Sequence, residues 1–251
     1  MTIAPSGLLK GKRIVVTGGG SGLGSAIAQK LSNEGAHILI TGRNEKKLAE
    51  ISEKIGCRYI VLDMTHVEEF SGFIDNATRI LGGTIDGLIN NAGISLHENS
   101  FFDVSPESFD QQIDTNFRGP FFLSQAYIRY LLASKSEGRI IMISSETGET
   151  VDCRPYGYTK AAINSMVKGL AHLFKEEKIR INAIAPGVTA TDMTGVARDG
   201  NYYAGHYGEG RYYLPEEIAE IAAFLLSPAA NCISGQIIAC NNAQTVNARW
   251  K

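Results

Sequence analysis

The chain has 251 residues, a net charge of −2, 44% hydrophobic residues and 20% charged residues. This composition excludes wholesale disorder, and the near-neutral charge provides no electrostatic footprint for nucleic acid or an anionic membrane. No apolar run approaches the roughly 20 residues of a membrane span, and residues 1–11 do not resemble a secretion signal. The four cysteines lack metal-ligand spacing, so we expect a reduced, cytoplasmic protein without a metal site.

Short apolar runs alternate with segments of helical periodicity along the chain. Strands that are apolar throughout suit a parallel sheet covered on both faces. The strand–helix repetition therefore predicts one α/β domain over residues 1–251, with a doubly wound, Rossmann-like sheet of about seven strands. The expected strands are residues 13–17, 36–40, 59–62, 86–90, 139–143, 180–185 and 236–239. The expected helices are residues 22–34, 44–55, 67–81, 106–133, 156–177 and 215–226.

Residues 186–214 form a long irregular stretch that interrupts this alternation. Stretches of this length inside compact domains are usually lids or binding loops. We therefore predict a substrate lid within the domain, and the alternative is a surface excursion without a role.

A glycine-rich turn joins the first expected strand to the first expected helix. Glycines there let the backbone turn sharply and let a pyrophosphate approach the helix N–H groups, whose dipole favours an anion. We therefore predict phosphate binding by a dinucleotide at Gly18, Ser21, Gly22, Leu23 and Gly24.

Tyr156 and Lys160 lie one helical turn apart, so their side chains share a face. A tyrosine near its usual pKa of about 10 is a poor acid or base at neutral pH. A lysine ammonium one turn away would stabilise the phenolate and lower the pKa of the phenol, which suits acid–base chemistry.

In combination, these motifs resemble the short-chain dehydrogenase/reductase family, over about residues 8–240. The resemblance implies a seven-stranded parallel sheet and an oxidoreductase that uses a nicotinamide cofactor. It rests on Thr-Gly-x-x-x-Gly-x-Gly at residues 17–24, Asn-Asn-Ala-Gly at residues 90–93, Asn116, Ser144-Ser145, Tyr156-x-x-x-Lys160 and Pro186-Gly187.

The same resemblance implies roles for four catalytic residues. Tyr156 would protonate the alkoxide during ketone reduction, or deprotonate the alcohol during oxidation. Ser145, rather than Ser144, would hydrogen-bond the substrate oxygen. Lys160 would hold the nicotinamide ribose and tune Tyr156, and Asn116 would anchor a water that relays protons past Lys160.

Further cofactor contacts are implied along the chain. For Asp63, the alternative is a capping role near the next helix, which Thr65 could also fill. The implied contacts are Asp63, Met64, Asn90, Ala92, Gly93, Tyr156, Lys160, Pro186, Gly187, Thr189 and Thr191.

The end of the second expected strand indicates which nicotinamide cofactor binds. An acidic residue there would hold the ribose hydroxyls of NAD, whereas this chain has Gly42 followed by Arg43. A guanidinium can bind a 2′-phosphate with two hydrogen bonds. We therefore predict NADP(H), with the alternative that Arg43 merely caps or solvates the following helix.

The residues expected around the substrate are polar, among them His97, Glu146, Tyr202 and Tyr207. Unpaired carboxylates against a steroid or acyl chain would be costly, so we expect a ketone or secondary alcohol on a small polar, sugar-like molecule. The alternatives are side chains that face solvent around an open cleft, a 3-oxoacyl thioester (acyl-carrier-protein) reductase, and a non-catalytic nucleotide-binding sensor or subunit.

The resemblance also implies a homodimer or homotetramer that pairs through the helices at residues 106–133 and 156–177. Two segments depart from the family's pattern. The loop from Ser145 to Tyr156 is shorter than usual, which suggests a modified pocket wall. Residues 241–243 read Asn-Asn-Ala, where many relatives have Asp-Gly-Gly.

Overall fold

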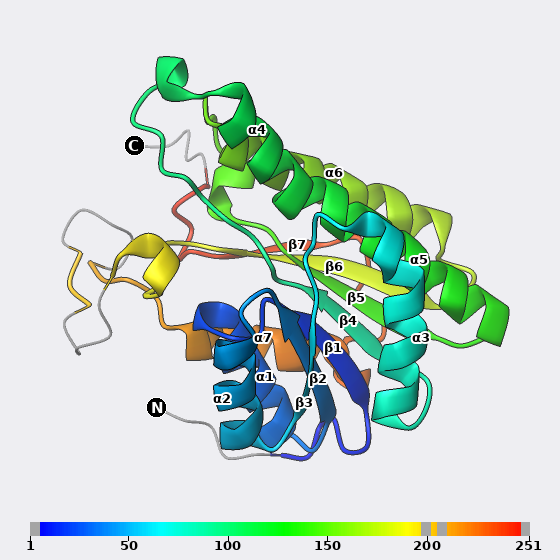
Figure 1. The fold of residues 1–251 in the computed structure, drawn as a ribbon. Coiled ribbons are helices and arrows are strands. Elements are labelled where there is room, and N and C mark those ends of the chain that lie inside the picture. The colour runs from blue at the N-terminus through cyan, green and yellow to red at the C-terminus, as the bar shows by residue number, and fades with distance from the viewer. Residues whose placement is uncertain (1–5, 197–201, 205–209, 247–251) are drawn as a thin grey trace.

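The computed structural model describes residues 6–196, 202–204 and 210–246. Seven parallel strands form one sheet in the order β3-β2-β1-β4-β5-β6-β7, which confirms the predicted doubly wound architecture (Figure 1). The strands are β1 (Arg13–Thr17), β2 (His37–Gly42), β3 (Arg58–Val61), β4 (Gly87–Asn90), β5 (Gly138–Ile143), β6 (Ile179–Pro186) and β7 (Ile237–Cys240).

Helices cover both faces of the sheet (Figure 1). One face carries α1 (Gly22–Asn33), α2 (Glu45–Ile55) and α7 (Pro215–Leu226). The other face carries α3 (Phe70–Leu81), α4 (Pro106–Ile113), α5 (Gly119–Ser134) and α6 (Pro155–Leu173). No helix within these described ranges is long and apolar enough to cross a bilayer.

Successive strand residues contribute to two separate cores, which explains why the strands are apolar throughout. Val15 and Leu39 pack on the α3, α5 and α6 side, whereas Val16 and Ile40 pack on the α1, α2 and α7 side. Side chains alternate between the faces of a strand, so a sheet covered on both faces needs apolar residues at every position.

The segment expected to be one helix over residues 106–133 is divided in two. A π-helical turn at Asp114–Arg118 separates α4 from α5. Pro120 has no N–H to bond to the carbonyl four residues earlier, and this position therefore favours a shift away from α-helical pairing. Single π turns often lie at functional sites, and this one carries Asn116.

Other helix boundaries differ by a few residues from the expected ones. The helix expected over residues 67–81 begins with a 3-10 turn at Val67–Glu69, followed by α3. The helix expected to reach residue 177 ends at Leu173, and Lys178 adopts a φ of 56° before β6 begins. Asn44 caps α2 by accepting a hydrogen bond from the Lys47 N–H at 3.0 Å.

Glu34 is a buried carboxylate that ties the N-terminal segment to α1. It accepts hydrogen bonds from the backbone N–H groups of Ser6 and Leu8 and pairs with Lys30 at 2.8 Å. Burial by itself raises the pKa of Glu34, but the hydrogen bonds from Lys30, Ser6 and Leu8 outweigh burial and lower the pKa to about 2. The carboxylate is therefore a stabilising group at neutral pH.

We expect Glu34→Gln to lower the free energy of unfolding by about 2 kcal/mol at neutral pH, since charge-assisted hydrogen bonds are lost. Because the pKa is depressed in the folded state, the native advantage is present above the ordinary carboxyl pKa of 4.5 and disappears as the pH falls towards 2. Urea unfolding of the unchanged protein and of Glu34→Gln across that pH range measures the difference in the free energy of unfolding. The exposed Glu53→Gln is the control, and equal stability of the two variants would contradict the role of Glu34.

Candidate active site

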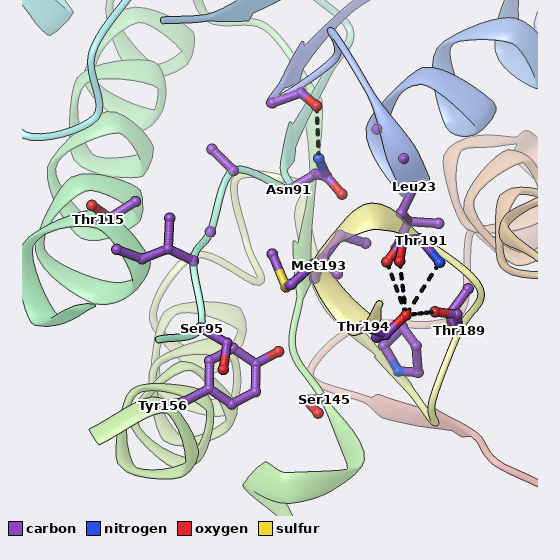
Figure 2. A pocket seen from close by; sticks show the side chains of 18 of the residues that line it. Leu23, Asn91, Ser95, Thr115, Ser145, Tyr156, Thr189, Thr191, Met193 and Thr194 are labelled. Atoms are coloured by element: carbon purple, nitrogen blue, oxygen red, sulfur yellow. Dashed lines mark hydrogen bonds between the residues drawn. The ribbon is translucent and has the colours of Figure 1, made fainter. Parts of the chain in front are cut away.

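A cavity of about 420 Å³ lies at the carboxyl ends of the central strands. The strand order reverses between β1 and β4, and this switch point is where open α/β sheets bind ligands. Loops after β1, β4, β5 and β6 and the start of α6 all contribute lining residues. Figure 2 shows Tyr156 and Ser145, from different elements, at the same cavity.

The glycine-rich turn after β1 forms one end of the cavity. Gly18 and Gly22 have φ values of 66° and 52°, a left-handed conformation that glycine adopts without strain. A side chain at Gly24 would collide with the carbonyl of Gly18. The residues expected to hold phosphate, Gly18, Ser21, Gly22, Leu23 and Gly24, all line the cavity.

The loop after β4 is fastened to this glycine-rich turn. The Thr17 hydroxyl accepts hydrogen bonds from the N–H groups of Asn91 and Ala92, both at 3.0 Å. The Asn91 amide donates to the Thr17 carbonyl at 2.9 Å. Ala92 and Gly93 line the cavity as expected.

Asn90 differs from its expected place in the cofactor site. Its buried amide donates to the Ser124 hydroxyl at 3.1 Å, and it is Asn91 that lines the cavity. Successive residues at a strand end point to opposite sides, so Asn90 faces α5. The sequence motif could have indicated Asn91 equally well, because both residues belong to it.

Arg43, Asp63 and Met64 line the same end of the cavity. The Asp63 carboxylate accepts hydrogen bonds from the backbone and hydroxyl of Thr65, both at 2.9 Å. Burial raises the pKa of Asp63, but the Thr65 hydrogen bonds and the Arg43 charge outweigh it and lower the pKa. Asp63 therefore holds a local turn through Thr65 and lines the cavity, and it does not cap the helix that follows.

Asn116, in the π-helical turn, holds the chain on the other side of the cavity. Its side-chain oxygen accepts from the Ile94 N–H, and its amide donates to the Ile94 carbonyl, both at 2.8 Å. A Cβ placed on Gly93 would lie 3.3 Å from this oxygen and 3.7 Å from Lys160 Nζ. Gly93 thus keeps space open between Asn116 and Lys160.

Tyr156 and Ser145 both line the cavity, and Ser145 acts on the pKa of the tyrosine. Burial raises the pKa of the Tyr156 phenol, and the hydrogen bond with Ser145 and the charge of Arg154 partly oppose this rise. The neighbouring Ser144 is buried, and its hydroxyl donates to Asn164 at 2.6 Å. Ser145 is therefore the serine of this pair that is placed against Tyr156.

Lys160 is a buried cation beside Tyr156. Its ammonium donates to the Ile143 carbonyl at 2.8 Å and lies 5.3 Å from the centre of the Tyr156 ring. Burial lowers the pKa of Lys160 to about 8. The helical spacing predicts that Lys160 lowers the pKa of Tyr156. In this structure the groups that lower this pKa are Ser145 and Arg154, and burial outweighs them, so the pKa of Tyr156 is raised.

The segment after β6 contributes lining residues to the cavity. Pro186, Gly187, Thr189 and Thr191 line it as expected, and a 3-10 turn follows at Asp192–Thr194. Figure 2 shows the Thr194 hydroxyl bonded within this segment, and it donates to the Thr189 carbonyl at 2.6 Å.

His97 connects the loop after β4 to this segment. A ring nitrogen of His97 lies 2.7 Å from the Met193 carbonyl. His97 and Met193 both line the cavity, so the segment after β6 contributes a wall of the site. Met193 was not anticipated from the sequence, because no local pattern marks a residue that reaches the site only through a turn.

The expected substrate residues divide into three groups. His97 and Glu146 line the cavity. Tyr202 does not, because it pairs with a neighbouring segment, where its carbonyl accepts from the Tyr212 N–H at 2.8 Å. Tyr207 lies outside the described residues.

Arg154 was missed in the sequence and lines the cavity two residues before Tyr156. Its guanidinium binds both carboxylate oxygens of Asp152, at 2.9 and 3.1 Å. Its position two residues before Tyr156 in the sequence could have indicated that Arg154 lies at the site. Arg154 and Glu146 thus place two charged side chains in the cavity lining.

A nicotinamide dinucleotide fits the residues that this cavity presents. The glycine-rich turn lines the cavity, and a Cβ would collide with neighbouring atoms at Gly18 and Gly24. A Cβ on Gly93 would lie 3.7 Å from the ammonium of Lys160. Arg43, which follows β2, lies where an adenosine ribose would be held in a Rossmann-type site, and Asp63 lines the same cavity.

Comparisons with known proteins agree with this geometry. The family model described as Enoyl-(Acyl carrier protein) reductase matches residues 18–242. A 3-oxoacyl-acyl-carrier-protein reductase of Rickettsia bellii is 33% identical over 239 residues, which cover 93% of this chain and 96% of that protein. A tropinone reductase homologue of Arabidopsis thaliana is 34% identical over 249 residues, which cover 95% of this chain and 93% of that protein.

A solved structure is also similar to this chain. A short-chain type dehydrogenase/reductase from Mycobacterium ulcerans matches with a TM-score of 0.87 and 28% sequence identity, covering 95% of this chain and 91% of that one. The chain therefore belongs to the short-chain dehydrogenase/reductase family of oxidoreductases.

Proposed function

We propose that this protein interconverts a ketone and a secondary alcohol on a small polar, sugar-like substrate, with NADP(H) as cofactor. The observation that carries the proposal is the Ser145–Tyr156 pair, which lies in one cavity with the glycine-rich turn and Arg43. Intact acid–base, lysine and asparagine positions argue against the alternative of a non-catalytic sensor.

The bound cofactor would supply or accept the hydride. In the reductive direction, the Tyr156 phenol donates its proton to the oxygen of the substrate carbonyl, and Ser145 hydrogen-bonds the same oxygen. Lys160 holds the ribose beside Gly93 and stabilises the tyrosinate that remains. Asn116 holds the Ile94 backbone, and we propose that it also anchors the water through which the proton is replaced.

Arg43 supports the choice of NADP(H). It is exposed at the cavity, its charge contributes to the lowered pKa of Asp63, and it follows Gly42 where an acid would favour NAD. We expect Arg43→Ala to raise the Kd for NADPH about 10- to 100-fold, since a charge-assisted pair to the 2′-phosphate is lost.

The Arg43 prediction is measured by titrating NADPH and NADH fluorescence. The Kd for NADH should change less than threefold, because NADH has no 2′-phosphate. Arg58→Ala, an exposed arginine at the other end of the sheet, serves as the control. Equal weakening of both cofactors would contradict the phosphate contact.

The substrate side of the cavity includes Ser95, His97, Glu146, Thr147 and Arg154. Polar and charged groups favour a substrate with hydroxyl groups over an acyl chain, because an apolar chain would remove these groups from water without offering hydrogen bonds in return. A second candidate is a 3-oxoacyl thioester reductase. It is favoured by the printed description of the matching family model and by the name of the Rickettsia bellii relative.

NADPH oxidation measured in parallel with an acetoacetyl thioester and a panel of keto-sugars separates these candidates. Turnover of keto-sugars alone supports the polar substrate. Faster turnover of the thioester would establish the second candidate, and NADPH binding without any turnover would favour the sensor.

We further propose a homodimer or homotetramer in the cytoplasm. Phe121 and Phe122 on α5 are 38% and 37% exposed, and burial of such a pair against a second copy would remove apolar surface from water. All four cysteines are free, which suits a reducing compartment. Light scattering of the purified protein measures the number of subunits.

A further inference from the structure

The segment after β7 folds back against the loop that carries the catalytic serine. Asn241, which is 1% exposed, donates from its side-chain amide to the Glu146 carboxylate at 3.2 Å. Thr245 donates to the Glu149 carboxylate, also at 3.2 Å. Two glutamates of the loop between Ser145 and Tyr156 are thus held by residues almost a hundred positions away in the sequence.

The orientation of the Asn241 side chain is fixed by two acceptors. Its amide nitrogen donates to Glu146 and also to the Thr245 hydroxyl at 3.1 Å. The opposite assignment would place the amide oxygen against a carboxylate oxygen, which is repulsive. The amide therefore presents a donor towards Glu146.

The turn that makes this contact possible is conformationally costly. Asn242 and Ala243 have φ values of 47° and 64°, a left-handed region that is unfavourable for a residue with a Cβ. The adjacent backbone is nevertheless held, because the Gly187 N–H donates to the Cys240 carbonyl at 3.0 Å and the Gln244 N–H to the Asn241 carbonyl at 3.1 Å. Strain that persists in this way often accompanies a functional constraint.

Glu146 immediately follows Ser145, and both residues line the cavity. A carboxylate has about four acceptor sites on its two oxygens, so one carboxylate can accept hydrogen bonds from protein groups and from a substrate donor at the same time. A hydroxyl group is such a donor, whereas an unsubstituted alkyl chain is not. Because Ser145 bonds the carbonyl oxygen in the proposed function, an adjacent acceptor would contact a group close to the carbonyl.

We propose that Glu146 determines specificity by accepting a hydrogen bond from a substrate hydroxyl near the carbonyl, and that Asn241 is the positioning residue for Glu146. The preferred substrates are then hydroxy ketones and the corresponding diols. This inference rests on the proposed function and adds to it a substrate class and a residue outside the cavity.

The test exploits the polarity of the Asn241–Glu146 hydrogen bond. In Asn241→Asp, two carboxylates face each other and Glu146 is displaced. We expect the KM for 1-hydroxybutan-2-one to rise at least tenfold, while kcat changes less than threefold. The KM for butan-2-one, which lacks the hydroxyl, should change less than twofold.

A second substitution should restore recognition. In the double variant Asn241→Asp with Glu146→Gln, the glutamine amide donates to the new aspartate, and the glutamine oxygen still accepts from the substrate. The KM for 1-hydroxybutan-2-one should return to within threefold of the unchanged protein. Glu149→Gln, which removes a nearby charge outside the cavity lining, is the matched control and should alter the KM less than twofold.

Three outcomes overturn the inference. An equal rise of KM for both ketones in Asn241→Asp, or a double variant that does not recover, would reduce Asn241 to a structural role. Equal kcat/KM values of the unchanged protein for the two ketones would show that Glu146 does not recognise the hydroxyl group. The proposed function would be unaffected by that result. Turnover of neither ketone, with NADPH binding intact by fluorescence, would overturn the proposed function and this inference together.

Discussion

Tyr156→Phe is expected to reduce kcat by at least about 1,000-fold, because it removes the group that exchanges a proton with the substrate oxygen. The ring and its packing remain, and Ser145 is unchanged. The Kd for NADPH should therefore change less than threefold. Steady-state NADPH oxidation with the preferred ketone, together with a fluorescence titration of NADPH, measures both quantities.

Tyr158→Phe is the matched control for this loss. Tyr158 lies on the same helix, two residues further on, and its side chain is 49% exposed. Tyr158→Phe should keep kcat within twofold of the value of the unchanged protein. Substantial activity in Tyr156→Phe would mean that another group supplies the proton, and a loss in both variants would point to a general effect on α6.

Lys160→Met is expected to remove most activity and at the same time to stabilise the fold. The buried ammonium has a pKa of about 8 instead of 10.5, a shift that corresponds to a cost of about 3 kcal/mol at neutral pH. In Lys160→Met the removal of this cost stabilises the fold, and the lost hydrogen bond to the Ile143 carbonyl offsets about 1 kcal/mol of the gain. The net expected gain in the free energy of unfolding is about 2 kcal/mol.

The pH dependence gives an independent check on Lys160. Since its pKa is lower in the folded state, the unfolded chain binds more protons between pH 8 and 10.5. The contribution of this group to the stability of the unchanged protein should therefore rise with pH in that range, and Lys160→Met should lack that rise. Urea unfolding at several pH values measures the difference.

Lys168→Met, at an exposed position of the same helix, is the control for the gain in stability. It should change the free energy of unfolding by less than about 0.5 kcal/mol, as is usual for surface substitutions. A destabilised Lys160→Met variant would show that the ammonium contributes more through its hydrogen bond than burial costs. A gain that coincides with lost activity would be a trade-off between stability and function.

The sequence by itself determined the architecture and much of the site. Apolar runs such as residues 13–17 and 139–143 report burial on both faces, which is a local property of a covered parallel sheet. Glycines at Gly18, Gly22 and Gly24 mark a turn that needs small residues, and this requirement is also local. These signals predict the fold, the phosphate-binding turn and the Tyr156–Lys160 pair without knowledge of any distant contact.

Only the tertiary structure decided which neighbouring side chains face the cavity. Asn90 and Asn91 have the same side chain, yet one bonds Ser124 and the other lines the site. The placement of Ser144 and Ser145 differs in a similar way. In both pairs, the deciding factor is packing against a helix that arrives later in the chain.

The tertiary structure also decided the pKa values and the long-range contacts. The spacing of Tyr156 and Lys160 predicts a charge effect, but the depth of burial, which depends on the whole fold, makes desolvation the dominant cause. The bond between Asn241 and Glu146 joins residues that are distant in sequence. No local pattern encodes it, because it exists only after β7 has paired with β6 and brought Asn241 beside Glu146.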